Sequence, residues 1–441
     1  MECEPAILRA SRCWPGQGLL PLQWAAMNST FAFDVCIRGA GIVGKTLALT
    51  LAREKLRVAL VAAPPAVATQ VGQEPARERD VRAYALNHAS HQLLQSLRCW
   101  PAAAVTPVQG MRIWGDGAGM VAFAAEALAD AAGTAPQAHA PLNWIVDVPA
   151  LEDVLDSAVH FQPSIEWVDA PVPAALTAIC EGRQSATRTA LGVEYETLAY
   201  AQHAVATRVR ARVPHQGVAR QWFQGDDILA LLPLGGTDGH EYAVVWSTTP
   251  EHARQLLLVE EDEFVTQLQA IVQHGHASEA DEGNASEAGA DELGFTLTAS
   301  RHRWPLRLSR ARHWTGAMPA AWAGAYTAGV AQNWVLLGDA AHTVHPLSGS
   351  GLNLGLGDVR ELAQQIAQRP LWRSAGDRRL LRNYERARKS ALVPFVLATD
   401  GLQQLFAHHE GAVHALRNWG MNQFDRSAGL KSWLVRQASG L

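Results

Sequence analysis

A glycine pattern set between two apolar runs is the feature that most restricts the fold of this 441-residue chain. Residues 33–38 and 57–61 are short, mainly apolar runs typical of buried strands. Between them Gly39, Gly41 and Gly44 form a G-x-G-x-x-G motif that leads into an apolar helical pattern. The motif alone would also suit an ordinary tight strand-to-helix connection. With a strand on each side and a helix after it, the motif predicts a Rossmann-like βαβ unit that binds a dinucleotide at the helix N-terminus.

A second segment, far downstream, has a comparable organisation. The apolar run 335–337 ends at Gly338, which places Asp339 at the carboxyl end of a predicted strand. There its carboxylate could accept hydrogen bonds from ligand hydroxyls. A glycine-rich loop and the start of a helix follow, with candidate ligand contacts at Pro346, Gly349, Gly351, Leu352 and Asn353. Because a helix N-terminus stabilises negative charge, this segment predicts a second contact with a nucleotide cofactor.

The middle of the chain changes to a period-two pattern. Residues 205–213 alternate apolar side chains with arginines, and shorter apolar runs follow at 218–223, 228–234 and 242–246. Such a series predicts an antiparallel sheet. After residue 358 the pattern is mainly helical. The predicted fold class is therefore α/β with α+β elements.

Taken in order, these segments resemble the ubiquinone-biosynthesis hydroxylases, which belong to the FAD-dependent class A aromatic monooxygenases and include p-hydroxybenzoate hydroxylase among their relatives. The likeness runs from about residue 33 to residue 440 and rests on several motifs: 39–44, 80–86, 304–306, 338–354, 381–389, 416–421 and 430–431. It implies a Rossmann-like FAD-binding domain, an antiparallel-sheet substrate domain and a helical C-terminus.

The resemblance also implies domain boundaries. The FAD-binding domain would be discontinuous, formed by residues 31–100, 141–200 and 305–372. The substrate-binding sheet would comprise 101–140 and 201–304. An N-terminal extension, 1–30, and C-terminal helices, 373–441, would flank them.

FAD is the cofactor that the resemblance implies, and it assigns roles to individual residues. Three glycines would approach the FAD pyrophosphate: Gly39, Gly41 and Gly44. Arg82 would contact the cofactor after the second strand, Gly338 and Asp339 would hold its ribityl or pyrophosphate region, and residues 346–353 would border the isoalloxazine ring. Arg82 could instead be a solvated charge, and Asp339 a helix N-cap. No catalytic residue is identified.

The implied reaction is hydroxylation of a polyprenylated phenol in ubiquinone biosynthesis. NAD(P)H would reduce the flavin transiently, and O₂ would react through a C4a-hydroperoxyflavin. The expected place is the cytoplasm, at the inner membrane surface beside other ubiquinone-biosynthesis proteins. Two alternatives stay open: a flavin hydroxylase of a soluble phenol, and a degenerate, non-catalytic scaffold paralogue in the same assembly.

Three positions depart from the family pattern. The acidic residue that usually binds the adenosine ribose is absent, with Ala62 in that region. Pro149 follows Asp147 and Val148 where the family has an Asn-Arg pair, and Glu181 replaces an aspartate. A lost hydrogen bond to a charged partner costs about 1.5–3 kcal/mol. Weak FAD binding is therefore expected.

The cavity lining and the C-terminus each allow two interpretations. The sheet residues Phe223, Leu229, Leu231, Leu232 and Pro233 are candidates for the substrate pocket, or they are core positions. The basic, Trp-bearing C-terminal pattern, with Trp419 and Trp433, suits either a helix-pair core or a membrane-surface element.

Composition excludes several other classes of protein. The five cysteines form no C-x-x-C pair, which fits a reducing compartment. His342 and His345 have no Cys or carboxylate cluster beside them, so no metal site is predicted. The net charge of −5 comes from segment 274–292, which is predicted to be a disordered acidic loop and without which the chain would carry +1. No basic tract predicts nucleic-acid binding, and no apolar run predicts a transmembrane helix.

Overall fold

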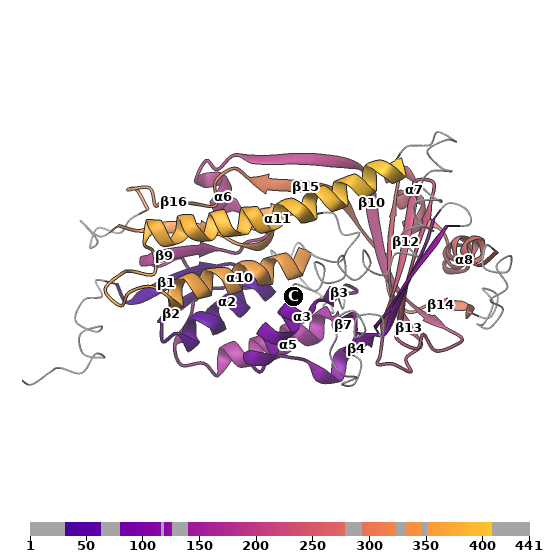
Figure 1. The fold of residues 1–441 in the computed structure, drawn as a ribbon, viewed down its shortest axis with the longest axis horizontal. Coiled ribbons are helices and arrows are strands. Elements are labelled where there is room, and N and C mark those ends of the chain that lie inside the picture. The colour runs from indigo at the N-terminus through magenta and orange to yellow at the C-terminus, as the bar shows by residue number, and fades with distance from the viewer. Residues whose placement is uncertain are drawn as a thin grey trace, which may run out of the picture.

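The computed structural model describes residues 31–62, 80–115, 119–125, 140–277, 293–322, 331–344 and 351–407. The predicted N-terminal extension, 1–30, lies outside these ranges, as do residues 408–441 of the predicted C-terminal helices. The described chain forms two sheets side by side, with helices around the first and on the outer face of the second (Figure 1).

The first sheet is mainly parallel. Its order is β16 (Thr315–Ala317), β17 (Asn333–Leu336), β9 (Ala174–Ile179), β1 (Phe33–Arg38), β2 (Val58–Val61) and β8 (Ile165–Val168). Only the β16–β17 pair is antiparallel. Val35, Cys36 and Ile37 of β1 are fully buried because helices cover both faces of this sheet. Those helices are α2 (Ile42–Arg53), α5 (Val148–His160), α6 (Ala186–Ala190), α10 (Gly351–Ala367) and α11 (Arg378–Ala407).

The second sheet is mostly antiparallel. Its main path is β18 (His342–Thr343), β15 (His302–Ala311), β10 (Tyr195–Ala211), β13 (Glu241–Thr248), β12 (Asp227–Leu234), β11 (Val218–Gln224), β5 (Gly110–Trp114) and β6 (Met120–Ala124), and β14 (Phe295–Leu297) pairs with β10. Helices α7 (Pro250–Leu258) and α8 (Glu261–Ala277) pack on the face that points away from the parallel sheet (Figure 1). The other face is therefore free to border a cavity between the two sheets.

A small antiparallel sheet lies between the two larger ones. It consists of β3 (Ala83–Leu86), β7 (Asn143–Asp147) and β4 (Val105–Val108), with α3 (His88–Ser96) and the short turn η1 (Ala102–Ala104) beside it. Its strands carry the chain from the parallel sheet towards the antiparallel one, so it connects the two halves.

The predicted fold class is confirmed, since a parallel sheet and an antiparallel sheet are combined in one mixed α/β architecture. Residues 274–277, which were predicted to belong to the acidic loop, form the end of α8 instead. The remainder of the predicted loop, 278–292, lies outside the described residues. None of the described helices is both long and apolar enough to cross a membrane.

Candidate functional site

A cavity of about 490 Å³ extends from the glycine turn after β1 to the inner face of the antiparallel sheet. Its lining includes Gly41, Arg82 and Asp339 on one side, and Ala206 and Ala230 on the other. Cavities of 300–1,000 Å³ are typical of cofactor and small-molecule sites. Residues far apart in the sequence therefore share one site.

The three glycines of the motif have different surroundings. A Cβ added to Gly41 would meet no atom within 4 Å, whereas one on Gly44 would lie 1.9 Å from the Gly39 carbonyl oxygen. Gly39 itself has φ of +106°, and a Cβ there would lie 2.5 Å from the carbonyl oxygen of Cys180. Gly39 and Gly44 are thus required by close packing of the turn against β9 and α2. Gly41 alone of the three lines the cavity.

Helix α2 presents its N-terminus at this turn. Gly41 is its N-cap, no side chain caps the first amides, and the first turn carries no acidic residue. Unsatisfied amides and the positive end of the helix dipole bind anionic groups such as phosphate. The entry to α2 therefore has the chemistry needed for a dinucleotide pyrophosphate.

Asp339 lies where the sequence placed it, just after β17 and inside the short turn η4 (Gly338–Ala340). Gly338 has φ of +57°, which favours glycine. No side chain caps η4, so the N-cap interpretation of Asp339 is wrong. Burial raises the pKa of Asp339, although His342, Arg183 and Arg82 oppose the rise. No hydrogen bond to its carboxylate occurs within the described residues, which leaves both oxygens available to a ligand.

Asp358, a buried carboxylate that the sequence analysis did not identify, stabilises this turn. Asp358 of α10 is fully buried, and its Oδ2 accepts a hydrogen bond from the Gly338 amide at 2.8 Å and lies 2.7 Å from His342 Nε2. Its Oδ1 accepts a hydrogen bond from Arg388 Nε at 2.7 Å. Burial would raise the pKa of Asp358, but His342 and Arg388 outweigh it and lower the pKa. His342 thus has a structural partner.

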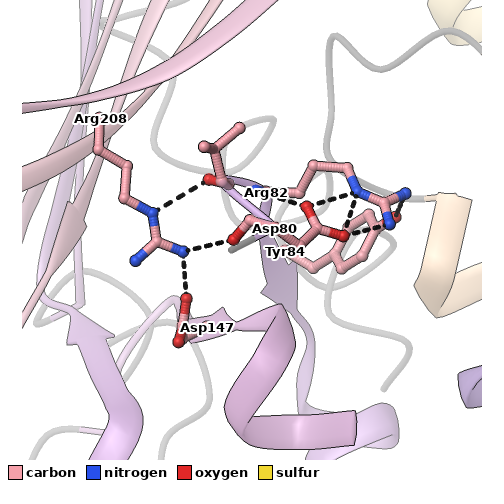
Figure 2. Close-up of polar contacts among 6 residues, drawn as sticks. Asp80, Arg82, Tyr84, Asp147 and Arg208 are labelled. Atoms are coloured by element: carbon pink, nitrogen blue, oxygen red, sulfur yellow. Dashed lines mark hydrogen bonds and ion pairs between the residues drawn. The ribbon is translucent and has the colours of Figure 1, made fainter. Parts of the chain in front are cut away.

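Arg82 lines the cavity, but its guanidinium is already paired (Figure 2). Its Nε lies 2.9 Å from both carboxylate oxygens of Asp80, and its Nη1 donates to the Tyr84 hydroxyl at 3.3 Å. Hydrogen bonding to Asp80 raises the pKa of Arg82 further above its ordinary value. Arg82 is therefore a partly exposed, paired charge at the cavity wall, and its contact with a cofactor stays a prediction.

Arg208 of β10 connects the two halves at the same place (Figure 2). Its guanidinium pairs with the carboxylate of Asp147 and donates to the carbonyl oxygens of Val81 and Asp80, each at 3.2 Å. Asp147 is the N-cap of α5, and Pro149 lies in the first turn of that helix, where proline is tolerated. The segment that departs from the family pattern thus forms a cross-sheet ion pair.

Glu181 also has a full set of partners. Its carboxylate accepts hydrogen bonds from Arg38 Nε at 3.0 Å, from the Ser185 hydroxyl at 2.7 Å and from the Thr187 amide at 3.0 Å. Although burial opposes it, these bonds lower the pKa of Glu181. The longer acid therefore fastens β1 to the start of α6, where Ser185 is the N-cap.

The start of α10 supplies a third side of the site. A Cβ on Gly351 would meet nothing within 4 Å, and both Gly351 and Leu352 line the cavity. The side chain of Asn353 is turned to the protein, since its Oδ1 accepts from the Asn87 amide and the Ser90 hydroxyl at 3.0 and 2.7 Å. The other predicted loop positions, Pro346 and Gly349, and also His345, lie outside the described residues. Within the described part of the chain, no group of side chains could hold a metal ion.

The antiparallel sheet lines the cavity with a different set of residues from the predicted one. On β12, Ile228, Ala230 and Leu232 face the cavity, while Leu229 and Leu231 are fully buried against α7 and α8. Successive strand residues point to opposite faces, so Leu229 and Leu231 lie on the covered face and are core positions. Of the predicted lining residues only Leu232 borders the cavity, since Phe223 and Pro233 do not. We call the inner face of β10, β11, β12 and β13 the cavity floor, and its small residues are Ala204, Ala206, Ala219, Ala230 and Ala243. Beside this floor, β15 lines the cavity with Trp304, Pro305, Leu306 and Arg307.

Known proteins resemble this chain in sequence and in fold. Residues 301–396 match the model of an FAD binding domain. The chain is 25% identical to the ubiquinone biosynthesis monooxygenase COQ6 of Mus musculus, over 95% of this chain and 93% of that protein. It is 26% identical to the ubiquinone hydroxylase UbiL of Rhodospirillum rubrum, over 92% and 89%. Its fold matches that of p-nitrophenol 4-monooxygenase PnpA from Pseudomonas putida with a TM-score of 0.63, at 15% identity over 92% of this chain and 98% of that one.

The matched FAD-binding segment and the sequence similarity over nearly the whole chain identify it as an FAD-dependent aromatic monooxygenase. Two features of this monooxygenase fit FAD. Gly41 leaves open the space that a Cβ would fill, and Asp339 has a carboxylate without a described hydrogen-bond partner beside the cavity. The matched FAD-binding segment includes Asp339, Gly351 and Asp358.

Several cavity residues of the monooxygenase were not predicted from its sequence. Arg183, which lowers the pKa of Asp339, and Glu152 lie on the cofactor side, and Gln221 and Ser247 lie on the cavity floor. Arg183 could have been suspected because it lies two residues after Glu181, where the chain departs from the family pattern. Gln221 carried no such signal, because a polar residue in a strand usually faces solvent.

Proposed function

We propose that this monooxygenase hydroxylates the aromatic ring of a polyprenylated phenol in ubiquinone biosynthesis, with NAD(P)H as electron donor and O₂ as co-substrate. The supporting observation is the continuity of the cavity from Gly41 to an uncharged, alanine-rich floor. Two relatives that match nearly the whole chain are named as a ubiquinone biosynthesis monooxygenase and a ubiquinone hydroxylase. A prenylated substrate would bring the reaction to the inner membrane surface, on its cytoplasmic side.

The cofactor side would be divided among three elements. Gly41 and the first amides of α2 would hold the FAD pyrophosphate, and Asp339 would accept hydrogen bonds from the ribityl hydroxyls. The N-terminus of α10, at Gly351 and Leu352, would face the flavin ring and stabilise negative charge on it. Bound FAD supplies the electron transfer and oxygen activation that no side chain provides.

The protein's own residues would orient the ring and exclude water. The cavity side chains contributed by β10, β11, β12 and β13 carry no charge within the described residues. Their methyl groups offer water no hydrogen bonds, so an apolar chain on the substrate would displace it readily. Asp358 would act indirectly, because it holds the Gly338 amide and so the position of Asp339.

The test is oxygen transfer by the purified protein reconstituted with FAD. With NAD(P)H and a prenylated phenol, the product should gain one oxygen atom by mass spectrometry, and ¹⁸O₂ should supply that atom. Asp339→Ala should abolish turnover through loss of FAD, whereas replacement of the exposed Asp169 by Ala should not.

Cells that lack this chain distinguish the proposed substrate from a soluble phenol and from a scaffold role. A prenylated phenol short of one ring oxygen should accumulate, ubiquinone should fall, and the Asp339→Ala gene should not restore it. Normal ubiquinone without a redundant hydroxylase would point to a soluble phenol as substrate. Rescue by Asp339→Ala would point to a scaffold.

A further inference from the structure

We propose that Gln221 anchors the phenol hydroxyl of the substrate by a hydrogen bond. Ser247 makes a second polar contact, and the apolar substituent of the substrate lies against the alanine-rich cavity floor. This inference rests on the proposed function, because it assigns an orientation to the substrate in the same cavity. Neither residue belongs to a sequence motif, and both are identified by their place in the fold.

Gln221 is buried, faces the cavity and has no polar partner among the described residues. Its side chain is 5% exposed, it lines the cavity, and none of the hydrogen bonds among the described residues involves its amide. Buried amides in folded proteins are almost always hydrogen-bonded. An amide kept unpaired on a cavity wall is therefore an available hydrogen-bonding group for a ligand.

The register of the sheet places Gln221 in a row of small and apolar side chains that line the cavity. It lies opposite Ala230, which lies opposite Val245, which in turn lies opposite Ala206. Cross-strand partners share a face of the sheet, so these residues form one row across the cavity floor. Methyl and isopropyl groups leave open space above these four cavity-lining residues, of which Gln221 alone is polar.

Ser247 lies in the neighbouring row. It is opposite Ile228 on one side and Ala204 on the other, is 2% exposed and lines the cavity. Its hydroxyl has no described hydrogen-bond partner either. The floor thus offers two neutral polar groups among apolar neighbours.

Neutral groups of this kind suit a phenol. A glutamine amide can accept the phenol O–H and donate to a second ring oxygen, and a serine hydroxyl can do either. A site built to hydrogen-bond a hydroxyl discriminates strongly against an analogue that lacks it, because the site's polar group is then left unpaired. Gln221 should therefore determine preference for the hydroxylated ring over its deoxy analogue.

The experiment compares two ligands on the FAD-loaded enzyme: 2-(3-methylbut-2-enyl)phenol and the same compound without its hydroxyl. Dissociation constants follow from the change in flavin absorbance. We expect the wild type to prefer the phenol at least tenfold. Gln221→Met, which keeps length but removes both polar atoms, should lose that preference and bind the deoxy compound as the wild type does.

Matched variants separate anchoring from packing. Gln221→Leu should behave as Gln221→Met does, Ser247→Ala should lose a smaller part of the preference, and replacement of the exposed Gln255 of α7 by Leu should keep it. Ala230→Phe should weaken both ligands alike by filling the floor. FAD content and thermal unfolding check that each variant is folded.

The outcomes distinguish this inference from the proposed function. If the wild type prefers and hydroxylates the phenol while folded Gln221→Met or Gln221→Leu keeps the full preference, the anchoring role is wrong and the proposed function stands. A wild type that binds both compounds equally also overturns the anchoring role. If the wild type binds FAD but neither compound, the proposed function fails and this inference with it.

Discussion

The two walls of the cavity are built by different means. On the parallel-sheet side the decisive features are backbone ones: the open space at Gly41, the uncapped N-terminus of α2 and the positive φ of Gly338. On the antiparallel side they are side chains, five alanines and two neutral polar groups on one face of a sheet. The first wall suits an invariant cofactor phosphate, and the second can change with the substrate without disturbing the fold.

The walls also differ in charge. The cofactor side carries Asp339, Arg82, Arg183 and Glu152, of which Arg82 is paired with Asp80, whereas β10 to β13 contribute no charged side chain to the cavity floor. Ionised groups in a partly buried site must be paired, which explains the ion pairs around Arg82 and Arg208. Substitutions on the two sides should therefore have different consequences.

The largest effect expected is loss of the cofactor from a folded protein. Gly41→Val should abolish stoichiometric FAD binding, because its side chain would enter the cavity without touching the protein. Gly44→Val should instead lower the free energy of unfolding by about 1–3 kcal/mol or more, since it would overlap the Gly39 carbonyl. Absorbance spectra and urea unfolding measure the two effects. A Gly41→Val protein that retains FAD would contradict the division of roles between these glycines.

A second prediction concerns Asp358, the buried carboxylate that binds the Gly338 amide. Asp358→Asn should lower the free energy of unfolding by about 3–5 kcal/mol, because it leaves Arg388 buried without its counter-charge. Since the folded-state pKa of Asp358 lies below its ordinary value of 3.8, its stabilisation is complete above that value and is lost as pH falls through the folded-state pKa. Urea unfolding between pH 3 and pH 7 should show this dependence in the wild type and a weaker one in the variant.

A smaller effect on stability is expected from the ion pair between Arg208 and Asp147, which connects the two walls. Arg208→Met should lower the free energy of unfolding by about 1.5–3 kcal/mol, because Asp147 loses its charged hydrogen bond. The matched control is Arg310→Met, which removes an exposed pair with Glu196 and should change little. Equal effects of the two substitutions would mean that the cross-sheet ion pair does not hold the halves together.

The smallest effect concerns the missing ribose acid. Ala62 directly follows β2, where its amide donates to Val168. Ala62→Glu should tighten FAD binding by about 1.5 kcal/mol, or roughly tenfold, by supplying an acceptor for ribose hydroxyls. Calorimetric titration of the apoprotein checks this. Low-nanomolar binding by the wild type would mean that another group already makes the contact.

The sequence analysis predicted most of the features that depend on backbone geometry. The βαβ unit, the position of Asp339 after its strand and the antiparallel middle of the chain were all predicted in the right place. A backbone that turns sharply or leaves room for a phosphate requires glycine, and glycine is visible in a sequence. The fold class followed because the period of the apolar pattern separates strands from helices.

Only the tertiary structure decided which side chains meet. Asp358 and Arg388 are thirty residues apart, and Arg208 and Asp147 sixty-one, with no local pattern to join them. The sequence of β12 is apolar on both faces. Which of the two faces borders the cavity is determined by α7 and α8, which cover the other face. Period two determines that the faces alternate, but not which face is covered. The backbone features of the cofactor wall could therefore be predicted from the sequence, whereas its ion pairs and the cavity floor, including Gln221, were determined only by the assembly of the sheets.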